Sequence, residues 1–169
     1  SHWCKIRTSQ VVMSTKHRPS NLDLDKLKSA SNKKFAIVCS EWNTEIINRL
    51  LEGAYDFFEN IGISKNKIDE LKVPGSYELI YGCSKIQSSE NYDAILAIGS
   101  ILRGETSHFK YISQSVFDGI KDLNINGKSP IVLCLLTDDT YQQSIDRSGG
   151  KHGNKGYDCA AATAKISLI

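Results

Sequence analysis

The sequence lacks the features that mark membrane, secreted and metal-binding proteins. Its 169 residues contain no run approaching the roughly 20 apolar residues that a membrane helix needs, and the N-terminus has no apolar core of the secretory type. The five cysteines include no CxxC pair, and no histidine lies at metal-ligand spacing. We therefore predict reduced thiols in an intracellular protein.

The sequence also has little net charge and no internal division. Its formal charge is +2, with Lys and Arg spread along the chain, which does not indicate a nucleic-acid or membrane partner. No repeat, low-complexity tract or linker interrupts it. The 40% hydrophobic content can bury a core of ordinary size, which predicts one compact α/β domain.

The first 33 residues are polar and weakly patterned, and the sequence begins at Ser1. We interpret residues 1–33 as a partly flexible N-terminal extension, processed or trimmed, before a domain over residues 34–169. Their Lys, Arg and Ser content is also compatible with the mature end left after import into a plastid or another organelle. The predicted location is the cytoplasm, with such an organelle as the alternative.

From Lys34 onward, short apolar runs alternate with amphipathic stretches of helical period, which is typical of βα units on a parallel sheet. Because parallel crossovers are right-handed, this order predicts a three-layer, doubly wound, flavodoxin-like domain with a central four-stranded parallel sheet. A strand from the N-terminal segment would extend that sheet. The predicted strands cover residues 35–39, 68–73, 93–98 and 131–136. The predicted helices have an apolar face from Ile47 to Ile61, begin at about Tyr77, have an apolar face from Ile112 to Leu123, lie around residues 141–148 and begin at about Tyr157.

Ligands of such sheets bind beyond the carboxyl ends of the strands. Four segments therefore deserve inspection: residues 40–43, 74–78, 100–108 and 137–139. Within the first, Trp42 directly follows a buried strand and could stack on a flat heterocycle. The alternative is a tryptophan packed on the edge of the sheet.

Residues 99–109 bring small residues, hydroxyls, an arginine and a histidine to the start of a helix. Free N–H groups at a helix start attract a phosphate or carboxylate. The positive end of the helix disfavours an imidazolium, so His108 would be a neutral proton acceptor. In the alternative interpretation, Thr106 or Ser107 only caps the helix and His108 is a surface residue.

Residues 147–156 place cations among glycines before the last helix. Glycine allows close approach to a ligand, and the Arg147 guanidinium can grip a phosphate through two parallel hydrogen bonds. The segment is not a Walker loop, because its residue order is wrong, and a solvated loop is the alternative. Four carboxylates are candidate acid–base or orienting groups, unless they are ordinary surface residues: Glu78, Asp138, Asp139 and Asp158.

Four motifs in order resemble those of the lumazine synthases. They are Ser-Glu-Trp-Asn at 40–43, Pro-Gly-Ser-Tyr-Glu at 74–78, Gly-Ser-Ile-Leu-Arg-Gly-Glu-Thr-Ser-His-Phe at 99–109 and Gly-Asn-Lys-Gly at 153–156. The third is long and specific, and the resemblance covers about residues 34–168. It implies condensation of 5-amino-6-(D-ribitylamino)uracil with 3,4-dihydroxy-2-butanone 4-phosphate to 6,7-dimethyl-8-ribityllumazine, phosphate and water, without cofactor or metal.

The resemblance also implies roles for individual residues. His108 matches the proton-transfer position, with Lys155 and Asp158 near it as catalytic residues. The phosphate would be bound by Gly104, Glu105, Thr106, Ser107 and Arg147. The pyrimidine and ribityl groups would be bound by Trp42, which stacks on the ring, Asn43, Ser76, Tyr77, Glu78, Leu133 and the backbone of Ser100, Ile101 and Leu102.

Two positions depart from the family pattern. Glu41 replaces a frequent arginine, and Leu133 replaces a frequent aromatic, so part of the pocket wall is aliphatic. The resemblance further implies a homopentamer or a sixty-subunit icosahedral shell, with sites between subunits and riboflavin synthase as a partner. The alternatives are a related riboflavin synthase, an inactive flavin-binding, lumazine-binding or shell-forming homologue, and an unspecific flavodoxin-like module.

Overall fold

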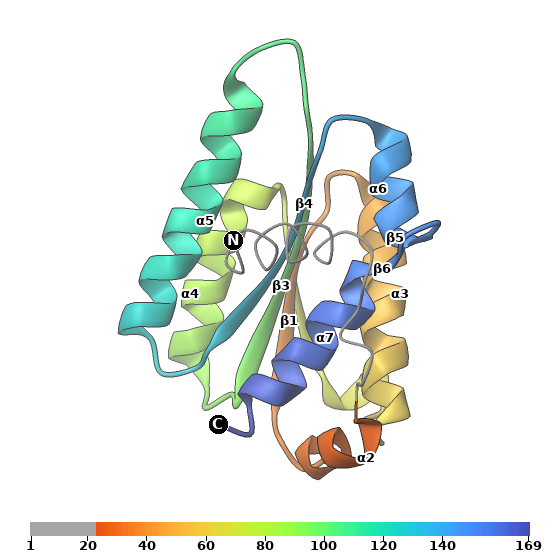
Figure 1. Ribbon diagram of the computed structural model, residues 1–169. Coiled ribbons are helices and arrows are strands. Elements are labelled where there is room, and N and C mark those ends of the chain that lie inside the picture. The colour runs from red at the N-terminus through yellow and green to blue at the C-terminus, as the bar shows by residue number, and fades with distance from the viewer. Residues whose placement is uncertain (1–22) are drawn as a thin grey trace, which may run out of the picture.

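The computed structural model describes residues 23–169 as a sheet between two layers of helices (Figure 1). The N-terminal part of this range forms α2 (Leu24–Leu27) and a 3-10 turn (Lys28–Ala30), which bury Leu27 and Ala30 in the core. Residues 23–33 are thus packed against the domain and do not form the N-terminal strand that was predicted to extend the sheet. Residues 1–22, which include Cys4, lie outside the described part of the chain.

The first βα unit follows the sequence pattern closely. Strand β1 (Phe35–Ser40) is buried at all six positions, as expected for a central parallel strand. Helix α3 (Thr44–Asn60) turns its apolar stripe inward and ends before Gly62, whose φ of 88° is the left-handed conformation that glycine accommodates at a helix end.

The second unit begins with β2 (Asp69–Val73), one residue later than predicted. A tight turn then leads into a 3-10 turn (Ser76–Glu78) and α4 (Leu79–Ser89). The predicted inward residues Leu79 and Cys83 are fully buried on this helix. Pro-Gly at the end of the strand therefore marks the turn that the sequence predicted.

The next two strands are longer than predicted. Strand β3 (Ala94–Leu102) continues past the glycine where we expected a loop, and β4 (Ile131–Asp138) extends two residues further than expected. The extensions pair with each other, in the register from Gly99 with Leu135 to Leu102 with Asp138. Backbone pairing between the two strands therefore overrides the turn propensity of Gly99-Ser100. Helix α5 (His108–Asn126) connects them.

The C-terminal segment folds back over α3. Helix α6 (Tyr141–Arg147) begins with a capping box between Thr140 and Gln143. The glycine-rich segment forms a small hairpin of β5 (Ser148–Gly150) and β6 (Gly153–Asn154) rather than an irregular loop. Helix α7 (Lys155–Ile166) starts two residues earlier than predicted, because the Asn154 side chain accepts hydrogen bonds from the N–H groups of Gly156 and Tyr157.

The four main strands are parallel in the order β2-β1-β3-β4, which confirms the three-layer, doubly wound architecture. Helices α3 and α7 cover one face, here called the closed face, and α4 and α5 cover the opposite face, the open face (Figure 1). Each face has its own hydrophobic cluster. The order in which strands are added to the sheet reverses between β1 and β3, and such sheets bind ligands at this point.

Candidate active site at the carboxyl ends of the strands

Strand β3 extends beyond its neighbour β1 and leaves a notch in the sheet. The last pair between the two strands is Cys39 with Ile98, whereas β3 remains paired with β4 as far as Leu102. Residues 100–102 therefore have no strand beside them on the β1 side, and their backbone groups on that side are not used in a ladder. Backbone donors and acceptors outside a ladder can bind side chains, as the Ser100 carbonyl does with Asn43, or the edge of a heterocycle.

Asn43 and Ser76 close the bottom of this notch. The Asn43 side-chain amide donates to the Ser100 carbonyl at 2.8 Å, and the Ser76 hydroxyl lies 3.5 Å from the same oxygen. Asn43 has a φ of 62°, a left-handed conformation that is costly outside glycine and is typical of functional sites. The Ser100 hydroxyl is buried without a hydrogen-bond partner among residues 23–169.

Trp42 lies next to the notch with 66% of its surface exposed. Its backbone N–H donates to the Pro74 carbonyl at 3.0 Å, and its indole ring lies on the backbone of Gly75. A Cβ at position 75 would be 2.6 Å from Trp42 Cε3, so this contact requires glycine. The indole thus rests on Gly75, directly after the edge strand β2, and keeps enough exposed surface for a flat ligand to stack on it.

The turn after β2 supplies the next wall. Tyr77 is exposed and Glu78 is half-buried, and both follow the buried Ser76 in the 3-10 turn. They therefore flank the notch on the open face, where the predicted ribityl contacts would be made.

The loop after β3 forms an open hollow of about 300 Å³ at the start of α5, lined by Arg103, Gly104, Glu105, Thr106, Ser107, Phe109 and Lys110. Ser107 occupies the N-cap position without a side-chain capping bond, while the Thr106 hydroxyl accepts from the His108 N–H at 3.3 Å. Capping thus engages Thr106 only, and the Ser107 hydroxyl has no part in it. The hollow combines a cation, hydroxyls and a helix start, which is suitable for an anion.

Arg103 is fixed at the rim of this hollow. Its backbone N–H donates to the Asp138 carbonyl at 2.9 Å. Its side-chain Nε lies 2.9 Å from the Asp139 carboxylate, and its guanidinium lies 5.5 Å from the centre of the Phe109 ring. His108, in the first turn of α5, is exposed toward solvent. It is accessible to a substrate bound at the loop.

Arg147, the predicted phosphate anchor, lies on the other side of the sheet. It is the last residue of α6 and pairs with the buried carboxylate of Asp138. Helix α6 packs near α3, where Tyr141 donates to the Glu45 carboxylate. Arg147 is therefore on the closed-face side of β4, whereas the loop of residues 104–107 leads to the open face.

Lys155 and Asp158 begin α7, also on the closed face. Both act electrostatically on Cys134 of β4 and on Cys159. The hydrogen bond between these two thiols raises the pKa of Cys134, with burial adding to the rise. The same bond lowers the pKa of Cys159, against burial and with help from Lys155.

The predicted site residues of one chain thus form two separate sets, carried by elements on different sides of the sheet (Figure 1). The first set lies around the notch and the α5 start: Trp42, Asn43, Ser76, Tyr77, Glu78, Ser100, Ile101, Leu102, Gly104, Glu105, Thr106, Ser107 and His108. The second contains Arg147, Lys155 and Asp158 on the closed-face side. Leu133, on the edge strand β4, belongs to neither set: it is half-buried and packs against the open-face cluster. Helices α5 and α7 lie on opposite faces, so one chain does not bring His108 to Asp158 (Figure 1).

Three features of the site were not predicted. Glycine at 75, directly after a strand proline, was recognised as a turn but not as the surface under Trp42. Asp138 and Asp139 were recognised as carboxylates, but not as the partners of Arg147 and Arg103. Two consecutive aspartates at a strand end, with two arginines in the flanking segments, are the signal that was available.

Within residues 23–169, no three His, Cys, Asp or Glu side chains are grouped as metal ligands. In the same range, no helix has the length and apolar character needed to cross a membrane. The four described cysteines, Cys39, Cys83, Cys134 and Cys159, are free thiols. Burial raises the pKa of both Cys39 and Cys83 to about 12, so these two are inert core residues.

Comparison with known proteins assigns the chain to a family. Residues 32–169 match the family described as 6,7-dimethyl-8-ribityllumazine synthase. The chain is 47% identical over 151 residues to the 6,7-dimethyl-8-ribityllumazine synthase of Christiangramia forsetii, covering 89% of this chain and 90% of that protein. It is 43% identical to the protein of the same name from Flavobacterium johnsoniae (89% and 79% covered) and 40% identical to that of Campylobacter jejuni subsp. doylei (88% and 96% covered).

Proposed function

The chain belongs to the 6,7-dimethyl-8-ribityllumazine synthase family and acts in riboflavin biosynthesis, and from this premise we propose how its residues share the reaction. The enzyme condenses 5-amino-6-(D-ribitylamino)uracil with 3,4-dihydroxy-2-butanone 4-phosphate and releases phosphate and water. The observation that carries the assignment of the site is the notch beside Trp42, which opens onto the anion-suited loop at residues 104–107. One crevice therefore offers a heterocycle site next to a phosphate site.

The pyrimidine binds in the notch. Its ring stacks on the exposed face of Trp42, and its polar edge meets the backbone of residues 100–102 on the side that β1 does not reach. Asn43, Ser76, Tyr77 and Glu78 surround the ribityl chain, because they line the floor and the open-face wall of the notch. This arrangement leaves the reacting amine directed toward the loop that follows β3.

The four-carbon substrate binds with its phosphate at the loop. The start of α5 and the hydroxyls of Thr106 and Ser107 hold the phosphate oxygens, together with the backbone of Gly104 and Glu105. Arg147 completes the phosphate site, because a guanidinium matches two phosphate oxygens at once. His108 moves protons as the amine adds to the ketone and phosphate leaves, and Lys155 and Asp158 assist it.

The active site is shared between neighbouring subunits. The notch and loop lie toward the open face, whereas Arg147, Lys155 and Asp158 lie on the closed-face side. A neighbouring copy can supply the second set, and Leu133 on the edge strand β4 can line the same boundary. The open face exposes aromatic side chains that such a neighbour would cover: Tyr77, Tyr81, Tyr111 and Phe117.

The assembly we propose is a homopentamer, with the sixty-subunit icosahedral shell as its larger form. Riboflavin synthase, which consumes the lumazine product, is the proposed protein partner, and the cytoplasm is the proposed location. Light scattering at micromolar concentration measures the oligomeric state. A monomer would contradict the shared site, whereas a stable pentamer would contradict only the shell.

A two-substrate assay tests the reaction. We expect the protein to form 6,7-dimethyl-8-ribityllumazine from the two substrates with equal release of phosphate, followed by absorbance and by a phosphate assay. Incubation with the lumazine alone tests the riboflavin synthase alternative, for which riboflavin would appear. Binding of the lumazine without turnover of the two substrates would instead identify an inactive homologue.

A further inference from the structure

Asp138 is a buried carboxylate at the end of an edge strand. Only 1% of its surface is exposed, and both of its oxygens are engaged. One accepts from Nη1 of Arg147, and the other accepts from the Ser144 hydroxyl at 2.9 Å. A buried carboxylate without such partners is strongly unfavourable, so Asp138 fixes α6 and its last residue against β4.

The next residue forms a similar pair with different surroundings. Asp139 binds Arg103, and both side chains are more than 60% exposed, at 63% and 62%. An exposed pair of this kind is screened by water and constrains geometry weakly. In the buried pair, the Asp138 carboxylate is inaccessible and the Arg147 side chain is only 34% exposed. Asp138 therefore restricts the conformation of Arg147 more strongly than Asp139 restricts that of Arg103.

We propose that Asp138 is the positioning residue for Arg147. The inference rests on the proposed function, in which Arg147 binds the phosphate of the four-carbon substrate. The carboxylate engages Nη1, and the guanidinium keeps further N–H donors for a second oxyanion. A long arginine side chain otherwise loses rotamer freedom when it binds, and a partner that orders it beforehand removes that cost.

Positioning and charge act in opposite directions at this site. Removing the Asp138 charge would increase the local positive charge and would, by itself, strengthen phosphate binding. Removing the partner would also release the guanidinium from its orientation, which weakens binding. Positioning dominates in our proposal, because the pair is buried and the charge of Arg147 remains in either case.

The Asp138→Asn variant of the full, assembled chain tests this order. We expect the KM for 3,4-dihydroxy-2-butanone 4-phosphate and the inhibition constant of inorganic phosphate each to rise about tenfold. The KM for the pyrimidine and kcat should change by less than about threefold. Asp25→Asn is the control: its ion pair with Lys28 is exposed and lies on α2, at the other end of the sheet (Figure 1), so it should leave all four quantities within about twofold.

Two further variants keep the test decisive. Ser144→Ala retains the carboxylate and removes one of its bonds, so it should raise the same two constants by about twofold to threefold even if Asp138→Asn does not assemble. Adding Asp138→Asn to Arg147→Lys should have little further effect, because the aspartate acts through the arginine.

The outcomes separate this inference from the function on which it rests. If Arg147→Lys leaves the KM of the phosphate substrate unchanged, Arg147 is not the phosphate anchor, and both proposals fail. If Arg147→Lys raises that KM but Asp138→Asn and Ser144→Ala do not, only the positioning role fails. Equal losses for both substrates in Asp138→Asn, or tighter inhibition by inorganic phosphate, would likewise overturn it.

Discussion

The two faces of the sheet differ in how completely their own chain covers them. On the closed face, Phe35, Phe57 and Phe58 are at most 1% exposed and pack in contact with one another. On the open face, the cluster is smaller, and α4 and α5 leave Tyr81 and Tyr111 about 70% exposed. A single chain thus buries a core on each face but leaves its most exposed tyrosines on the open face. In the assembly proposed above, the closed face serves folding and the open face serves contact with a neighbour.

The strongest test of this comparison is a truncation on the closed face. Phe57→Ala removes a fully buried ring that also makes an edge contact with Tyr157. We expect a loss of about 3–5 kcal/mol in the free energy of unfolding, as for other buried aromatic residues. Urea unfolding at matched protein concentration measures this loss. A change below about 1 kcal/mol would show that the closed face is not the folding core.

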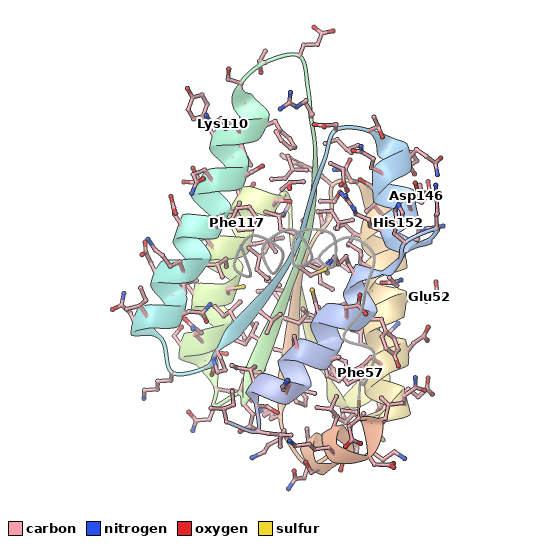
Figure 2. The ribbon with its side chains drawn as sticks, in the orientation of Figure 1. Glu52, Phe57, Lys110, Phe117, Asp146 and His152 are labelled. Carbon is pink, nitrogen blue, oxygen red and sulfur yellow. The ribbon has the colours of Figure 1, made fainter. Side chains whose placement is uncertain are left out.

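A charge on the open face should instead break the assembly. Phe117 is 45% exposed on α5 (Figure 2), and Phe117→Glu would place a carboxylate where a neighbour packs. We expect smaller species by light scattering, a native circular dichroism spectrum, and condensation activity reduced at least about 100-fold, because each site loses residues of the neighbour. Leu168→Glu, in an exposed position after α7, is the control that should remain assembled and active.

The third test concerns the chemistry at the boundary between the faces. His108→Ala should lower kcat by about 10- to 1000-fold, with small changes in both KM values, because one acid–base group typically contributes about 10²–10⁴-fold. His152→Ala, in the exposed β5–β6 turn (Figure 2), is the matched control and should keep normal turnover. Normal turnover of His108→Ala would reduce His108 to a helix-start residue.

Most of the fold could be predicted from the sequence, because its buried strands are short apolar runs and its helices carry periodic apolar stripes. The ends of β3 and β4 could not, since residues 99–102 read as a turn and become a strand only by pairing with residues 135–138. The early start of α7 depends on the Asn154 side chain, which the glycine-rich surroundings concealed. Local patterns thus determine the elements, and contacts between elements determine where they end.

The site, like the fold, was predictable where it depends on local sequence and not where it depends on contacts between elements. Residues that follow strands or begin α5 were predicted from their position, since a parallel sheet collects its strand ends at one edge. The pairing of Asp138 with Arg147 was not predicted, because it depends on α6 packing back onto β4. Nor does periodicity reveal that His108 and Asp158 lie on opposite faces. A prediction that they act together requires a second subunit.

The smallest expected effect tests whether the pyrimidine binds beside the open face as proposed. Gly75 has an extended backbone, with a φ of −120° that any residue adopts, so its substitution adds no backbone strain. A Cβ there would nevertheless lie 2.6 Å from Trp42 Cε3 and would push the indole away from its present position.

Gly75→Ala should therefore raise the KM for the pyrimidine by about threefold to tenfold while the KM for the phosphate substrate changes little. Quenching of tryptophan fluorescence by the bound pyrimidine should weaken in parallel. An unchanged pyrimidine KM would mean that stacking on Trp42 does not contribute to binding, and the notch alone would then have to account for recognition of the ring.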